Sequence, residues 1–365
     1  MKRIFFVILL LIVAATSFGD KTEPLRAEIA KNKSELQELE RKEANETGIL
    51  DALSRRIILI NDLVDALRER DSTLSRRLDV LEDSLRIKRD ELDSANATRA
   101  ELLRAMFIRG KGGEYAFILD SDGFGDFVSR VGYFVYLAEA RMRISALADS
   151  AAAQVAVLID STTRVHTEVI ETRRARENEL DSLRAAKDRK MAVITKIRQD
   201  KSAYQRAISE MEQSLAQLTR EMPQAVMPGD FERNKGSLPW PTTSKTILHP
   251  FGIVKEKRFG TEFKNAGIDI ATQPEERVLS VAPGRVAQIS WLRGYGRIVI
   301  LEHGGGYFSV YGNLGQVEVL KGQDISNGHT IGYTAADGWL EGAKLHFEIR
   351  KGKEEVNPLE WLITV

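Results

Sequence analysis

Apolar residues recur at spacings of three and four along most of the first 222 positions. Over residues 25–102, and again over 194–222, leucines, isoleucines and methionines keep a seven-residue phase, and charged residues fill many of the positions between them. This arrangement is typical of the a and d positions of a coiled coil. No proline interrupts it, so long helices are possible. We therefore predict a coiled coil over residues 20–222, loosened and able to bend where polar residues stand in the seam, at Asn32, Glu43, Glu46, Asp71 and Lys88.

Glycine and aromatic residues break this pattern at about residues 106–137. The glycines from Gly110 to Gly132 weaken a helix, and phenylalanines and tyrosines cluster around them. The two arms can therefore fold back as an antiparallel hairpin with this segment at its tip, as a small helical cap. The aromatic residues either fasten the hairpin or offer an apolar surface to a partner. The sequence supports both interpretations equally.

The pattern changes again after Met222. Pro223, Pro228 and Gly229 end the helix, so residues 223–237 are predicted to be a hinge or linker. Over residues 238–365 short β-rich runs alternate with glycine-containing turns, and a triple glycine between two such runs predicts a hairpin. The predicted fold class is α+β and multidomain: a long antiparallel coiled-coil hairpin followed by an antiparallel β-rich domain.

The first 19 residues have the pattern of a secretory signal peptide. Lys2 and Arg3 precede an apolar run from Ile4 to Ala15 that is short for a membrane span, and small residues follow it. We expect cleavage after Gly19 and a periplasmic, soluble mature protein; the alternative is an uncleaved N-terminal anchor. The 53 basic and 53 acidic residues balance, so no nucleic-acid footprint is visible.

Two residues in the C-terminal domain have the chemistry of a metal site, Asp269 and His346. Catalytic zinc sites use three protein ligands and a water molecule. A strand of the form His-x-His would place two imidazoles on one face, but this chain has Lys344 at the first position and Asn265 where another histidine would precede Asp269. We expect the Lys344 ammonium to pair with Asp269 instead of a metal. His166, His249, His303 and His329 are interpreted as structural or locally bonded histidines.

A series of ordered motifs gives this domain a specific resemblance. They are Leu238-Pro239-Trp240-Pro241, Phe251-Gly252, Gly267-Ile268-Asp269-Ile270, Ala282-Pro283-Gly284-Arg285-Val286, Gly294-Tyr295-Gly296, Tyr311-Gly312-Asn313-Leu314, Leu345-His346-Phe347-Glu348 and Asn357-Pro358-Leu359-Glu360-Trp361-Leu362. In this order they resemble the LytM domain, the fold of the lysostaphin-type zinc endopeptidases, over about a third of the chain. Active members have histidine at the positions of Asn265, Asn313 and Lys344. The resemblance therefore implies a degenerate domain with no catalytic residue, metal or other cofactor.

A degenerate LytM domain behind a coiled coil is similar to the EnvC type of murein hydrolase activator. The resemblance implies a groove that binds a peptidoglycan amidase, a coiled coil that engages an FtsEX-like ABC transporter at the division site, and a helix that can cover the groove. The covering helix would lie within residues 181–222, or in the segment to Ser237. The groove residues it implies are Asn265, Asp269, Tyr295, Asn313, Lys344, His346 and Arg350.

Two other functions remain open from the sequence. One is an active zinc metalloendopeptidase that cleaves peptidoglycan cross-links, for which a third ligand and a base are missing. The other is a structural rod of the cell envelope whose β domain only grips peptidoglycan. A partner amidase, a partner transporter and contact with peptidoglycan are therefore expectations.

Overall fold

The structure is a computed structural model that describes residues 21–41, 46–108, 123–229, 231–256, 259–336, 338, 340 and 342–364. The predicted signal peptide and residues 109–122 of the predicted glycine-rich tip lie outside the described residues. The chain divides into two compact units. The first contains residues 1–65 and 179–365, and the second contains residues 66–178. Each is described by itself below.

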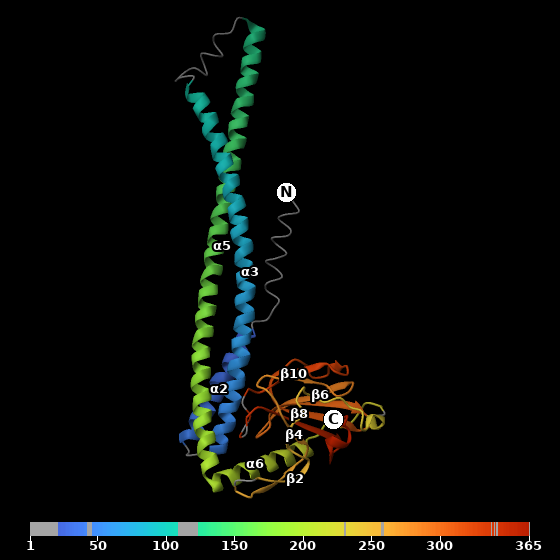
Figure 1. The fold of residues 1–365 in the computed structure, drawn as a ribbon. Helices are drawn as coiled ribbons and strands as arrows, with labels where there is room; N and C mark the ends of the chain where they lie inside the picture. The colour runs from blue at the N-terminus through green and yellow to red at the C-terminus, as the bar shows by residue number, and fades with distance from the viewer. Residues whose placement is uncertain are drawn as a thin grey trace. The chain divides into compact units, whose positions relative to one another are not determined.

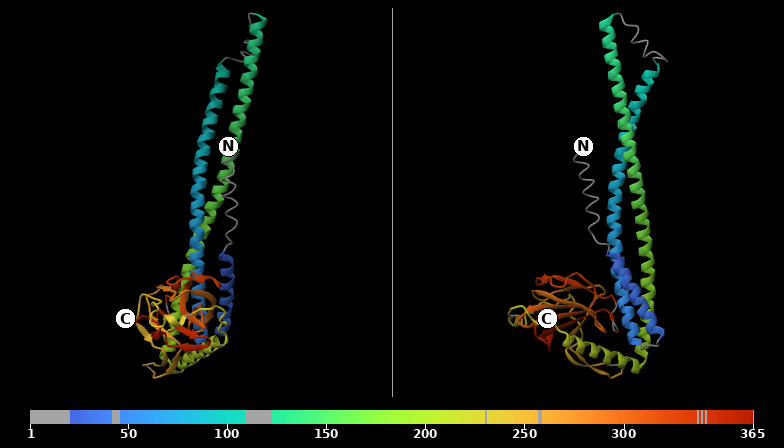
Figure 2. Two further views of the ribbon diagram at one scale, coloured as in Figure 1. Left: turned by 90° about the vertical axis from the view of Figure 1, so that its right-hand side faces the viewer. Right: turned by 180° about the vertical axis from the view of Figure 1, so that it is seen from behind.

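Four helices account for the predicted coiled coil: α2 (Thr22–Arg41), α3 (Glu46–Ile108), α5 (Phe124–Gln199) and α6 (Lys201–Arg220). The first arm is thus two helices, and residues 42–45 between them lie outside the described part of the chain. The polar seam positions Asn32, Asp71 and Lys88 lie inside these helices and do not interrupt them. Leu36 of α2 is buried in one cluster with Ala52 and Leu53 of α3. Helix α2 therefore packs beside the first turns of α3 (Figure 2).

The pairing of α3 with α5 is antiparallel in both units. In the first unit Glu46 contacts Lys196 and Arg56 contacts Ser182. Residue numbers along α5 therefore decrease as residue numbers along α3 increase. In the second unit Asp71 pairs with Arg173, and Arg99 pairs with Asp149. The predicted antiparallel hairpin is confirmed. The interior of the second unit is built from Leu74, Val165 and Val169.

The part of α5 in the second unit keeps many apolar side chains exposed. The exposed set near the start of α5 is Phe124, Phe127, Val128, Tyr133, Val135, Tyr136 and Met142. Among the described residues, α5 is the one helix that is long and apolar enough to cross a membrane by length and composition alone. The exposure of these side chains agrees with a partner surface, and that role stays a prediction.

The β domain is antiparallel throughout its sheets. Its strands are β1 (Ile247–His249), β2 (Gly252–Lys255), β3 (Glu262–Asn265), β4 (Ile268–Ala271), β5 (Arg277–Leu279), β6 (Gly284–Leu292), β7 (Gly296–Gly304), β8 (Tyr307–Val317), β9 (Asp324–Ile325), β10 (Thr330–Thr334), β11 (Lys344–Lys351) and β12 (Glu354–Val356), and short 3-10 helices η1 (Phe231–Asn234) and η2 (Pro358–Glu360) flank them. The main sheet runs β1-β4-β11-β8-β7-β6-β9, and β2 pairs with β3 separately. Together with the helices this confirms the predicted fold class.

Period-two alternation assigns the strand residues to two faces. On β7, Val299 and Leu301 enter the inner core of the domain, whereas Ile298 and Ile300 join the cluster that contains the buried face of α6. Strand β8 alternates in the same way, whereas β11 gives only its inner-face residues to the core and has charged residues on its other face. Figure 1 and both views of Figure 2 place α6 beside the strands of the β domain. One face of the main sheet therefore packs on its own core, and the other packs on α6.

The predicted linker is held against the β domain. The backbone N–H groups of Val226 and Met227 both donate to Glu302 Oε1, at 2.5 and 2.6 Å. Phe231, farther along the same segment, is buried and stacks on His303 and Trp361. These contacts fix the C-terminal end of the connection from α6 to the sheet.

Candidate functional site

A row of four charged side chains runs along one face of β11. Lys344, His346, Glu348 and Arg350 alternate with Leu345, Phe347 and Ile349, which fill the inner core. Because side chains alternate between the faces of a strand, all four project toward the α6 side of the sheet. All four are buried. Four neighbouring buried charges are stable only if each has a partner.

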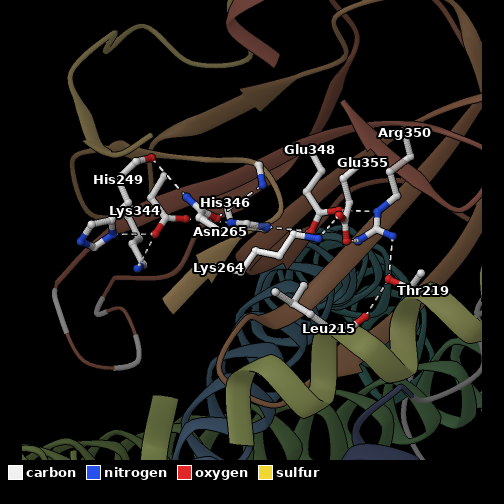
Figure 3. A network of polar contacts seen from close by, with 12 residues as sticks. Leu215, Thr219, His249, Lys264, Asn265, Lys344, His346, Glu348, Arg350 and Glu355 are labelled. Atoms are coloured by element: carbon white, nitrogen blue, oxygen red, sulfur yellow. Dashed lines mark hydrogen bonds and ion pairs between the residues drawn. The ribbon is translucent and has the colours of Figure 1, made fainter. Parts of the chain in front are cut away.

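Asp269 on β4 is the first partner. Strand β4 lies between β1 and β11 and places this carboxylate opposite both His249 and His346. Asp269 Oδ2 lies 2.9 Å from Lys344 Nζ and 2.9 Å from His249 Nδ1, and Oδ1 lies 2.7 Å from His346 Nδ1 (Figure 3). Burial alone would raise the pKa of Asp269, but the Lys344 charge and the two histidine hydrogen bonds hold it well below the usual range.

The chain of contacts continues from His346 to the α6 helix. His346 Nε2 lies 2.8 Å from Glu348 Oε1, and the Arg350 Nε–H group donates to Glu348 Oε2. The Arg350 Nη1–H group donates to Thr219 Oγ1 of α6 at 2.9 Å. Burial opposes the charged form of His346, but its two carboxylate partners raise its pKa to about 9. Burial would likewise raise the pKa of Glu348, but His346 and Arg350 lower it to about 2.

This donor set does not fit a metal ion. Both ring nitrogens of His346 face carboxylate oxygens, and the raised pKa keeps both of them protonated at neutral pH. The Lys344 ammonium holds an oxygen of Asp269, as the sequence predicted. Zinc requires a neutral imidazole and a free carboxylate oxygen. Within the described part of the chain, no group of three or more His, Cys, Asp or Glu residues is placed to hold a metal.

The other predicted groove residues lie around this network. The Tyr295 ring stands 4.5 Å from the His346 ring, and burial raises the pKa of Tyr295 well above its usual value. Asn265 donates its amide hydrogens to the carbonyl oxygens of His249 and Pro250. Asn313 has a positive φ of 62°, a conformation that asparagine tolerates better than most residues. Its backbone N–H group donates to Tyr295 O at 2.6 Å.

Helix α6 covers this site. Tyr204, Ile208 and Met211 of α6 line one hollow together with Asp269, Tyr295 and Lys344. The buried residues Ala203, Tyr204, Ala207, Ile208, Met211, Leu215 and Leu218 recur at the three- and four-residue spacing of one helix face. Asp200 caps the helix, accepting hydrogen bonds from the backbone N–H groups of Ser202 and Ala203. The segment proposed from the sequence as a covering helix thus packs over the predicted groove.

The sequence did not identify three members of the network. His249 was interpreted as a locally bonded histidine, and in the structure its partner is Asp269. This contact depends on the pairing of β1 with β4. A single sequence does not reveal that pairing. Glu348 was visible as the alternate residue after His346 but was not assigned a role. Thr219 lies on a helix whose facing partner could not be known. His303, interpreted as structural, is buried between Pro283 O and Ser309 Oγ.

Two buried histidines predict how the stability of this unit depends on pH. His346 binds its proton more tightly in the folded chain, with a pKa of about 9 against 6.5, so its contribution is complete below pH 6.5 and is lost as the pH rises toward 9. Burial lowers the pKa of His303 to about 4, so its contribution is present above pH 6.5 and is lost as the pH falls toward 4. We expect maximal stability near pH 6.5 and an alkaline loss of about 3 kcal/mol.

Denaturant unfolding between pH 4 and pH 9 measures this profile. The variant His346→Gln should lose the alkaline fall, and His303→Gln should lose the first part of the acid fall. His329, in a turn, provides the matched control His329→Gln, which should leave both limbs unchanged. An alkaline fall that persists in His346→Gln would show that the proton held between Asp269 and Glu348 is not its cause.

The comparisons with known proteins define the β domain. Residues 263–358 match Peptidase family M23. This part of the chain is therefore similar to the M23 peptidases, the relation that the ordered motifs predicted. The catalytic domain of the antimicrobial peptidase lysostaphin from Staphylococcus simulans is similar at 20% identity, covering 31% of this chain and 89% of that chain, with a TM-score of 0.28.

Two similar proteins are murein hydrolase activators. The chain is 34% identical over 128 residues to the murein hydrolase activator EnvC of Escherichia coli (strain K12), which covers 35% of this chain and 29% of that protein. It is 35% identical over 124 residues to the murein hydrolase activator NlpD of the same strain, which covers 34% of this chain and 30% of that protein. The chain thus spans less than a third of the length of either relative.

Proposed function

We propose that the protein is an exported, catalytically inactive activator of peptidoglycan N-acetylmuramoyl-L-alanine amidases. The observation that carries this proposal is the buried network in which Lys344 and His346 hold Asp269. It places an ammonium and an imidazolium ion against the carboxylate that a zinc peptidase would use for its metal. The similarity to two murein hydrolase activators supports an activating role for a domain of this kind.

The site of activation is the groove over β4 and β11. It contains an aromatic ring, Tyr295, and the buried charged groups of Lys344 and Arg350. Aromatic and arginine side chains at the centre of a contact surface contribute most of the binding free energy in protein complexes. In the structure described above, which we call the closed state, α6 occupies the same groove. The amidase therefore competes with α6, and its apparent affinity is reduced by the fraction of molecules that are closed.

The coiled coil carries the regulatory input in this proposal. The apolar surface of α5 over residues 124–142 includes the strongly exposed side chains of Phe124 and Tyr136. An apolar surface on a helix is suited to bind another protein. We infer that this surface engages an FtsEX-like ABC transporter in the periplasm, and that the transporter opens the groove during daughter-cell separation.

The fragment 223–365 tests both halves of the proposal. It retains the linker held by Glu302 and the core residue Phe231 but lacks α6. We expect this fragment to fold, to release no material from purified peptidoglycan with or without added zinc, and to activate an amidase of the same cell more strongly than the full mature chain does. Dye release from labelled peptidoglycan measures both activities.

The competing function, a zinc endopeptidase, predicts the opposite outcome. Zinc-dependent solubilisation by the fragment alone, abolished by His346→Ala, would establish the enzyme and refute the activator. Equal activation by fragment and full chain would show that α6 does not inhibit. Metal analysis of the purified full chain adds an independent criterion, because an enzyme of this class would carry zinc in stoichiometric amount.

A further inference from the structure

The β domain has a second contact with the helices, made by α3. Asp51, Arg55 and Asp62 lie at positions i, i+4 and i+11, which fall on one face of a helix. Asp51 Oδ1 accepts a hydrogen bond of 3.0 Å from Trp291 Nε1, and Arg55 lies over the Trp291 ring at 5.3 Å. Trp291 lies near the end of β6 and Arg297, the partner of Asp62, lies near the start of β7. The two residues pair with each other across the β6–β7 hairpin.

The strongest of these contacts is an ion pair between Arg297 and Asp62. Arg297 Nη2 lies 2.7 Å from Asp62 Oδ2, and Nη1 lies 3.5 Å from Asp62 Oδ1. The same Nη1–H group donates to the carbonyl oxygen of Gly315 on β8 at 3.1 Å. A guanidinium that is fixed to its own sheet and paired with both oxygens of a carboxylate has little freedom left to lose.

The α3 contact covers a part of the groove that α6 does not line. Asn313 faces a small hollow lined by Ser54, Ile57 and Ile58 of α3, whereas α6 residues line the hollow beside Asp269. The Asn313 Nδ2 atom is buried and finds no hydrogen-bond partner in the described part of the chain. A buried amide without a partner raises the free energy of the closed arrangement. Moving α3 away would relieve this and present the amide to an incoming acceptor.

We propose that Asp51, Arg55 and Asp62 of α3 form a polar latch that closes the groove together with α6 and must open for a partner to reach Asn313. The latch deepens the proposed function, on which its regulatory role rests. Asp62 stands three positions before Asp65, where the first unit ends, and α3 itself continues into the second unit. A force or bend transmitted along α3 therefore reaches the latch without passing through α6.

A charge reversal tests the latch in the full mature chain. The protein has no cysteine, so Lys31→Cys on α2 and Lys321→Cys on the β domain, both exposed, can carry spin labels whose separation reports whether the domain is held. We expect Arg297→Asp and Asp62→Arg each to broaden the distance distribution, and the double exchange Asp62→Arg with Arg297→Asp to narrow it again. The matched control is Arg285→Asp, which breaks an ion pair with Asp324 inside the β domain and should change nothing.

Amidase activation is measured on the same proteins. Each single reversal should raise activation by the full chain roughly fivefold, and the exchange should reverse the gain. Unchanged distances in both single variants would refute the latch. A different outcome is that the single reversals broaden the distances without raising amidase activation, while the α6 substitutions Ile208→Glu and Met211→Glu do raise it. That outcome would refute the regulatory role of the latch. If neither type of substitution produces activation, the proposed function fails, and the distance data alone decide on the latch.

Discussion

Replacing Ile208 and Met211 by glutamate should raise amidase activation by the full mature chain more than about tenfold. Both side chains are buried on the face of α6 that packs on the groove. A carboxylate buried there without a partner costs several kcal/mol, because it loses its hydration. The cost is avoided when α6 leaves the sheet, so the substitutions increase the open fraction. Activation as a function of chain concentration gives the shift directly.

The exposed face of the same helix supplies the control. Gln205 and Gln213 are exposed, and the isosteric pair Gln205→Glu and Gln213→Glu adds the same two charges to α6. This variant should activate no better than the parent chain. Equal gains in the two variants would show that negative charge on α6, and not its displacement from the groove, produces the effect. Circular dichroism of both variants verifies that the helices remain formed.

The double substitution Asn265→His and Lys344→His should create zinc binding and weaken amidase activation. The imidazole at position 265 would join Asp269 and His346 to give three ligands. Removal of Lys344 takes the ammonium away from Asp269 Oδ2 and leaves His249 as the one remaining partner of that oxygen among the described residues. Three such ligands bind zinc with a dissociation constant of about 1 µM or lower at neutral pH. Because His346 must release the proton that it shares with Asp269, binding should release protons and weaken as the pH falls.

The same double variant tests whether the groove is the amidase site. Altering residues at the centre of a contact surface costs roughly 2 kcal/mol or more, so activation should require more than about tenfold more protein. Calorimetry measures zinc, and amidase turnover measures activation. Lys344→His alone lacks the third ligand and should bind zinc far more weakly, and Lys321→Ala, in an exposed turn, should alter neither quantity. A double variant that binds zinc and activates the amidase as well as the parent chain does would show that the groove is not the amidase-binding site.

The helical part of the fold follows from the sequence because heptad periodicity is a local property. The spacing of apolar residues predicted long antiparallel helices. The polar lapses of the seam did not indicate where the first arm is interrupted, because Asn32, Asp71 and Lys88 lie inside continuous helices. The direction in which α2 folds was not predictable, since it depends on which surface Leu36 reaches. That surface is formed by Ala52 and Leu53, and nothing in the seven-residue phase distinguishes it from the surface of α5.

The candidate site was predictable residue by residue but not as a network. Motif order placed Asp269, Lys344 and His346 together, and the charge of Lys344 predicted its pairing with Asp269. The roles of His249 and Thr219 depend on the pairing of β1 with β4 and on the position of α6, which are long-range contacts. The pairing of Arg297 with Asp62, 235 positions apart in the chain, leaves no local signal at either residue.

In the proposed function the groove of the β domain activates an amidase and does not itself cut peptidoglycan. The most direct test of this function is the amidase-dependent release of labelled peptidoglycan in the presence of the full mature chain that carries Ile208→Glu and Met211→Glu. We predict that release rises well above the rate of the amidase alone, and that the variant without amidase releases nothing at any zinc concentration. Release by the variant alone, or an amidase rate that the variant leaves unchanged, would contradict the account.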